Sequence, residues 1–119
     1  MKKVLVIEDN DANMYLTRFI LEKNGYMVLE ERTGLGGIER AIKEKPDLIL
    51  MDIQLPDING LEATKRIRSS VLGHAVPIVA ITSYAMTGDR EKTMAAGCDG
   101  YVEKPINPET FMKELKKYC

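Results

Sequence analysis

The chain has 119 residues, of which 45% are apolar and 29% charged, and this balance is typical of a globular protein. The length fits a single domain over residues 1–119. The formal net charge is -1 and the basic residues are dispersed, which argues against a direct nucleic-acid partner. No apolar run approaches the ~20 residues of a membrane span, so we expect a cytoplasmic protein without membrane insertion.

Two cysteines, Cys98 and Cys119, lie far apart in the sequence and form no C-x-x-C pair. This spacing predicts two free thiols and indicates neither a zinc site nor a disulfide framework.

Short aliphatic segments alternate with helical patterns along the whole chain. The expected strands are Val4 to Ile7, Met27 to Leu29, Leu48 to Met51, Ile78 to Ile81, and Tyr101 with Val102. They show no polar alternation, which is typical of strands buried on both faces, and single helices as connections imply parallel neighbours. The pattern predicts an α/β fold, a doubly wound (βα)5 sandwich.

Local signals mark most ends of the five expected helices. The first helix ends at Asn24 and Gly25, where glycine suits a left-handed C-terminal position. The second begins at Thr33 and ends before Pro46, and the third follows the turn that ends at Gly60. The fourth covers about 87–96, and the fifth has Asn107 as its N-cap.

The spacing of apolar residues predicts which side of each helix faces the sheet. The expected inward-facing residues are Leu16, Ile20 and Leu21 in the first helix, Leu35, Ile38 and Ile42 in the second, Leu61, Thr64 and Ile67 in the third, and Phe111, Leu115 and Tyr118 in the fifth. In the third helix we expect Lys65, Arg66 and Arg68 to face water.

Polar residues follow the predicted strands at their carboxyl ends, where open parallel sheets bind ligands. They are Glu8 and Asp9 after the first strand, Asp52 after the third, Thr82 after the fourth and Lys104 after the fifth. Taken singly, each has an ordinary structural explanation, such as a helix cap, a turn former or a solvated charge. Together, crowded carboxylates repel one another and favour a bound cation.

The predicted cluster offers only oxygen ligands, which favours Mg²⁺, with Mn²⁺ as the second choice. Such a site is completed by a phosphate oxygen, since Mg²⁺ binds few protein carboxylates. Asp52 could then attack a phosphoryl donor as a carboxylate nucleophile, while Lys104 and Thr82 contact the phosphoryl oxygens.

Four segments resemble the receiver domain of two-component response regulators: VLVIEDND, PDLILMDIQLPDINGLE, VPIVAITSYAM and AAGCDGYVEKPI. The resemblance covers the whole chain and implies the flavodoxin-like strand order 2-1-3-4-5. The chain is similar to stand-alone receivers, including DivK-type cell-cycle regulators, and to receivers of hybrid kinases. The positions of Met1 and Cys119 favour a stand-alone protein.

The resemblance implies a role for each residue of the cluster. Asp52 accepts the phosphoryl group from a histidine kinase or a histidine phosphotransfer protein. Asp9, Asp52 and the backbone carbonyl of Gln54 bind the metal directly, and Glu8 acts through water. The Lys104-Pro105 peptide bond is expected to be cis.

The same resemblance implies a switch and a downstream protein partner. Thr82 and Tyr101 move together on phosphorylation and reshape the face formed by the fourth helix, fifth strand and fifth helix. Gln54 and Tyr84 tune the lifetime of the phosphate. A monomer or weak dimer is expected.

Two alternatives share parts of this pattern. A phosphatase of the haloacid-dehalogenase type also uses an aspartate nucleophile, but it needs a second aspartate where this chain has Gln54. A flavodoxin-like cofactor binder would need a phosphate loop, and the glycine cluster at 34–37 lacks the G-x-G-x-x-G spacing.

Overall fold

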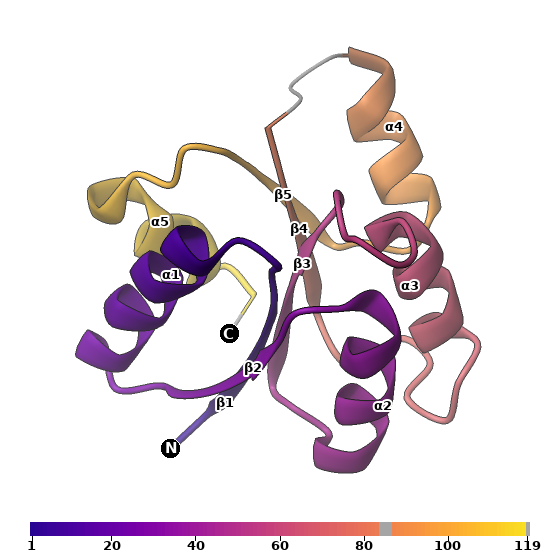
Figure 1. The fold of residues 1–119 in the computed structure, drawn as a ribbon, viewed down its shortest axis with the longest axis horizontal. Helices are drawn as coiled ribbons and strands as arrows, with labels where there is room; N and C mark the ends of the chain where they lie inside the picture. Colours follow the sequence, from indigo (N-terminus) through magenta and orange to yellow (C-terminus); the bar gives the residue numbers. More distant parts are fainter. Residues whose placement is uncertain (84–86, 119) are drawn as a thin grey trace.

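The computed structural model describes residues 1–83 and 87–118, and within them a five-stranded sheet lies between two layers of helices (Figure 1). The strands are β1 (Lys3–Ile7), β2 (Met27–Glu31), β3 (Leu48–Asp52), β4 (Ile78–Thr82) and β5 (Gly100–Glu103). The helices are α1 (Asp11–Lys23), α2 (Gly34–Glu44), α3 (Gly60–Arg68), α4 (Thr87–Ala95) and α5 (Pro108–Leu115).

All strand pairs are parallel and the order is β2-β1-β3-β4-β5, which confirms the predicted fold. The chain passes from β1 outward to β2 and then returns across β1 to β3. The order therefore reverses between β1 and β3, and their carboxyl ends carry Glu8 and Asp52 side by side.

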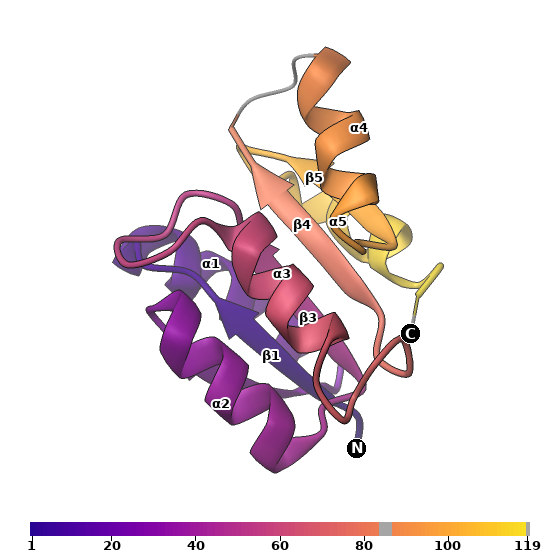
Figure 2. The same ribbon diagram turned by 90° about the vertical axis from the view of Figure 1, so that its right-hand side faces the viewer.

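The side chains of the central strands alternate between two cores because successive residues of a strand point to opposite faces. One core holds Val4, Val6, Leu48 and Leu50 and is covered by α1 and α5. The other holds Leu5, Ile7, Ile49 and Met51 and is covered by α2 and α3. Figures 1 and 2 show these helices on opposite sides of the sheet.

Local hydrogen bonds support the starts of four helices, two of them at the predicted N-caps Thr33 and Asn107. The side chains of Asn10, Thr33, Asn59 and Asn107 accept backbone N–H groups at the starts of α1, α2, α3 and α5. Gly25, which follows α1, has a φ of +86°. Glycine adopts this left-handed conformation without the steric strain that a Cβ would add.

The prediction for the inner face of α2 was partly wrong. Leu35 and Ile42 are 47% and 37% exposed, whereas Gly34, Gly37 and Ala41 are buried. The backbone of α2 lies so close to the sheet that a Cβ on Gly37 would stand 2.4 Å from a methyl group of Ile7. Small residues therefore face the sheet, which explains the glycine cluster by packing.

Arg68 was also predicted wrongly, because its side chain is only 7% exposed. Its guanidinium donates to the carbonyl oxygens of Gly97, Gly73 and Val76 and pairs with Asp99 at 2.7 Å. These acceptors compensate for the lost hydration, so a charged residue can end α3 beneath the surface.

Strand β2 differs from the expectation of burial on both faces. It forms one edge of the sheet and pairs only with β1, and its residues are half-buried or exposed.

Candidate functional site

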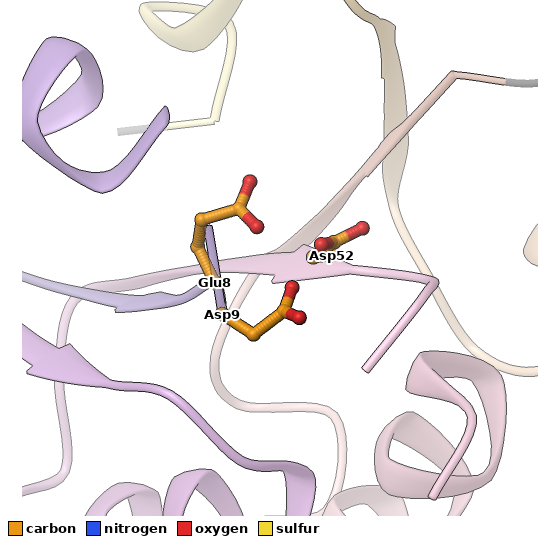
Figure 3. A group of neighbouring side chains, drawn as sticks. All are labelled: Glu8, Asp9 and Asp52. Atoms are coloured by element: carbon orange, nitrogen blue, oxygen red, sulfur yellow. The ribbon is translucent and has the colours of Figure 1, made fainter. Parts of the chain in front are cut away.

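Three carboxylates meet at the end of the sheet where the carboxyl ends of the strands lie. Glu8 and Asp9 follow β1, and Asp52 is the last residue of β3. One oxygen from each lies within 4.8 Å of the others, and Figure 3 shows the carboxyl groups around a common space. Asp52 and Glu8 are 3% and 4% exposed, whereas Asp9 is exposed to solvent. The cluster is thus open to solvent at Asp9.

Lys104 brings a positive charge to the two buried acids. Its Nζ lies 2.9 Å from Glu8 Oε1 and 3.3 Å from Asp52 Oδ2, and its side chain is 15% exposed. The residue follows β5, and its backbone N–H donates to the Thr82 carbonyl at 2.7 Å. The Lys104-Pro105 peptide bond is cis. The ends of β1, β3, β4 and β5 therefore meet at one site.

The pKa values of the acids reflect this crowding. Burial, a hydrogen bond with Glu8 and the charge of Glu8 raise the pKa of Asp52 to about 7. Burial also opposes the charge of Glu8, but hydrogen bonds with Asp52, Lys104 and the Asn10 backbone outweigh it and lower the pKa of Glu8. The two pKa values shift in opposite directions, so Glu8 loses its proton more readily than Asp52 does.

The donor set fits a divalent cation of the hard class. All three side chains offer carboxylate oxygens, and the exposed Asp9 leaves room for water ligands, as Mg²⁺ requires. A cation among the carboxylates would offset the repulsion that raises the pKa of Asp52. This arrangement favours an ionised Asp52 when a metal is bound.

Three of the remaining predicted residues, Thr82, Tyr101 and Gln54, lie within the described part of the chain. Thr82 is buried at the end of β4, and Tyr101 is half-buried in β5 beside a pocket of about 360 Å³. Gln54 is exposed, and its backbone N–H donates to Asp52 Oδ1 at 3.1 Å. Tyr84, predicted to tune the phosphate lifetime, lies outside the described residues.

One polar residue near the site was not predicted. The carboxylate of Asp57, in the segment between β3 and α3, accepts the backbone N–H groups of Gly34 and Leu35. The sequence identified Asp57 only as part of a turn, since its partners lie 23 and 22 positions earlier in the chain. A contact of this range leaves no local sequence signal.

Comparison with known proteins identifies the family. Residues 4–116 match the family described as "Response regulator receiver domain". The chain belongs to this family. The receiver domain is also 42% identical over 117 residues to the polar-differentiation response regulator DivK of Brucella anthropi, with 98% of this chain and 95% of that protein covered. DivK of Brucella ovis shows the same identity and coverage.

Solved structures of other receiver domains agree in fold. A receiver domain of a sensor histidine kinase from Pseudomonas aeruginosa PAO1, which has a magnesium ion coordinated in its active site cleft, is 34% identical with a TM-score of 0.91. The alignment covers 98% of this chain and 96% of that one. The chemotaxis protein CheY4 of Vibrio cholerae is 28% identical with a TM-score of 0.94, over 100% and 99% of the two chains.

These similarities confirm the prediction of a receiver domain of a two-component response regulator, and none of them favours the phosphatase alternative. Receiver domains of this family act with histidine kinases or phosphotransfer proteins and with downstream partners. Within residues 1–83 and 87–118, no helix is both long and apolar enough to cross a membrane.

Proposed function

We propose that Asp52 of this receiver domain accepts a phosphoryl group and that the modified site signals to a protein partner. The observation that carries the proposal is the position of Asp52, buried at the end of a central strand and 3.3 Å from the Lys104 ammonium. A buried carboxylate beside a fixed cation and two further acids has the surroundings of a nucleophile rather than those of a surface charge.

In the reaction, an oxygen of Asp52 attacks the phosphorus of a phosphohistidine in a kinase or phosphotransfer protein. The new O–P bond forms as the P–N bond breaks, and the electron pair leaves with the imidazole, which takes a proton from water. Lys104 faces the negative charge of the phosphoryl oxygens, and the Thr82 hydroxyl donates to one of them.

A metal ion belongs to this proposal. Asp9, Asp52 and the backbone carbonyl of Gln54 hold Mg²⁺ directly, and Glu8 contacts it through water. When bound, Mg²⁺ supplies positive charge that offsets both the carboxylates and the phosphoryl oxygens. Mn²⁺ is the expected substitute, since it accepts the same oxygen ligands. The exposed edge at Asp9 supports this assignment because it gives ions and water access to the cluster.

The signal leaves through the face formed by α4, β5 and α5. Thr82 moves toward the phosphate and Tyr101 turns inward, which changes the pocket that Tyr101 lines together with Arg90, Glu103, Pro105 and Phe111. A downstream protein reads this change. Gln54 and Tyr84 control the access of water to the acyl phosphate. We place the protein in the cytoplasm, as a monomer or weak dimer.

Intact-mass measurement tests the proposal. After incubation with Mg²⁺ and acetyl phosphate, we expect the protein to gain the mass of one phosphoryl group, and we expect no gain in Asp52→Asn. Asp47→Asn is the matched control, because Asp47 precedes β3 and therefore lies at the opposite end of the same strand. Removal of Mg²⁺ with a chelator should abolish the adduct, and Mn²⁺ should restore it.

Two results would contradict the proposal. One is an adduct that persists in Asp52→Asn, which would assign the phosphoryl group to another residue. The other is the absence of any adduct in the wild-type protein at millimolar acetyl phosphate and saturating Mg²⁺. Sustained hydrolysis of a phosphate monoester would instead favour a catalytic phosphatase.

A further inference from the structure

The segment between β3 and α3, residues 53–59, forms a loop whose two ends meet. The Gly60 N–H donates to the Ile53 carbonyl at 2.8 Å. Gly60 also packs so tightly that a Cβ there would stand 2.2 Å from the Asp52 carbonyl oxygen. The base of the loop is therefore fixed against the last residue of β3.

The tip of the loop is fixed to a different element, the N-terminus of α2. Asp57 Oδ1 accepts the Gly34 N–H at 2.7 Å, and Asp57 Oδ2 accepts the Leu35 N–H at 2.8 Å. Hydrogen bonds from helix N-terminal N–H groups to a carboxylate are strengthened by the charge of the acceptor and by the helix dipole. They lower the pKa of Asp57 to about 2, so the carboxylate is charged at neutral pH.

An apolar contact reinforces the same attachment. Ile58 is half-buried and lies against Gly34, where a Cβ would stand 2.6 Å from Ile58 Cγ1. Gly34 is thus the residue at which both Asp57 and Ile58 approach the backbone of α2. Because the two contacts are adjacent, the loop tip has little freedom to move relative to the helix.

The stretch from Gln54 to Pro56 lies between the fixed base and the fixed tip. Its first residue, Gln54, carries the carbonyl that the proposed function assigns to the metal, and its N–H is bonded to Asp52 Oδ1. The carbonyl belongs to the next peptide group along the loop, so its direction depends on how both ends of the loop are held. A backbone ligand has no rotamers to adjust, so only the path of the chain can hold it in place.

We propose that Asp57 is a positioning residue for the metal site, which ties the β3–α3 loop to α2 and thereby holds the Gln54 carbonyl at the carboxylate cluster. This inference rests on the proposed metal ligands. It assigns a role in Mg²⁺ binding to a residue that lies outside the cluster and contacts none of its acids among the described hydrogen bonds.

The test is the affinity for Mg²⁺ alone, measured by titration of the unphosphorylated protein with the amide NMR signal of Gln54 as the reporter. Loss of a group that holds a metal ligand in place typically lowers metal affinity by about tenfold or more, so we expect a loss of about that size in Asp57→Ala. Asp57→Asn keeps one acceptor oxygen, so its Mg²⁺ affinity should fall less than that of Asp57→Ala. Asp57→Glu keeps the carboxylate, and its Mg²⁺ affinity should also be higher than that of Asp57→Ala.

Thr33→Ala is the matched control, because it removes a hydrogen bond at the same helix end without touching the loop. The Thr33 hydroxyl accepts the Gly36 N–H at 3.0 Å. Both alanine variants should lower the melting temperature, since each removes a cap of α2. Only Asp57→Ala should weaken Mg²⁺ binding and shift the Gln54 signal in the absence of metal.

The outcomes separate this inference from the proposed function. An unchanged Mg²⁺ affinity in Asp57→Ala would overturn the positioning role, and so would equal losses in Asp57→Ala and Thr33→Ala. If Asp57→Ala fails to fold, the Mg²⁺ affinities of Asp57→Asn and Thr33→Ala are compared instead, and equal affinities would overturn the positioning role. If the wild-type protein itself binds no Mg²⁺ and forms no adduct at Asp52, the proposed function fails instead.

Discussion

The ionisation of Asp52 depends on residues that are distant in the sequence. Burial and Glu8 raise its pKa to about 7, whereas Lys104 acts in the opposite direction. Lys104 itself is partly buried, which disfavours its charge, but hydrogen bonds and attraction from Glu8 and Asp52 raise its pKa. Without a metal, the two buried acids, Glu8 and Asp52, therefore share one cation, Lys104, and a negative charge on both acids at once is costly.

This balance predicts a pH-dependent stability for the metal-free protein. A raised pKa means that the folded state binds the proton more tightly than the unfolded state does, so the contribution of Asp52 to stability falls as pH rises from about 4 to about 7. Asp52→Asn removes this titration. In the presence of a chelator at pH 8, we expect the variant to be more stable by about 1–3 kcal/mol.

Urea unfolding at pH 4, 6 and 8 measures the effect. The stability difference between Asp52→Asn and wild type should grow with pH and should shrink when Mg²⁺ is added, because the cation stabilises the wild-type carboxylate. A difference that is constant across this range would show that Asp52 is not the titrating group.

At the scale of elements, close approaches of helix backbone to the neighbouring strands hold the site together. Gly60 begins α3 directly against the carbonyl of Asp52, and Gly37 brings α2 onto Ile7 of β1. Both contacts lie in the layer of α2 and α3, which also holds the β3–α3 loop (Figure 2). Elements on this side of the sheet therefore set the geometry at the end of β3.

We expect Gly60→Ala to destabilise the protein although alanine favours a helix. The new Cβ would meet the Asp52 backbone oxygen at 2.2 Å, and backbone cannot rotate away as a side chain could. Overpacking of this kind costs about 1–3 kcal/mol or more. Lys65→Ala, at an exposed position of the same helix, should change the unfolding free energy by less than about 0.5 kcal/mol.

Thermal and urea unfolding compare the two variants. Gly60→Ala should also weaken Mg²⁺ binding, since it displaces the end of β3. A variant as stable as wild type would mean that α3 shifts along the sheet without cost.

At the scale of the whole molecule, Arg68 joins parts of the chain that local structure leaves separate. It connects the end of α3 with the α3–β4 segment, with Gly97 after α4 and with Asp99 before β5. Asp99 in turn accepts the N–H of Ile78 at the start of β4. This network holds together the end of the sheet opposite to the site, where β4 and β5 begin.

Alanine substitutions of two neighbouring arginines are expected to differ in their effect on the unfolding free energy. Arg68→Ala should lower the unfolding free energy by about 2–4 kcal/mol, because it leaves carbonyl groups without their donor. Arg66→Ala should cost less than about 0.5 kcal/mol, since its side chain is 50% exposed and pairs only with the exposed Glu62 among the described contacts. Equal effects in urea unfolding would support the sequence prediction that both face water.

The sequence by itself determined the alternation of strands and helices, most helix ends and the polar residues at the strand ends. These features depend on local physics: β-branched and aliphatic runs, capping side chains and glycine at left-handed positions. The exposure of Leu35 and the burial of Arg68 were not predictable in this way, because both depend on how closely a helix approaches its neighbours.

For the site, the sequence supplied Glu8, Asp9, Asp52 and Lys104 as candidates, and the parallel topology explains why they meet. Only the tertiary structure decided their separations, the burial of Asp52 and the attachment of Asp57 to α2. The reason is physical: pKa shifts and charge pairs vary with distance and burial, and both are fixed when segments far apart in the chain pack together.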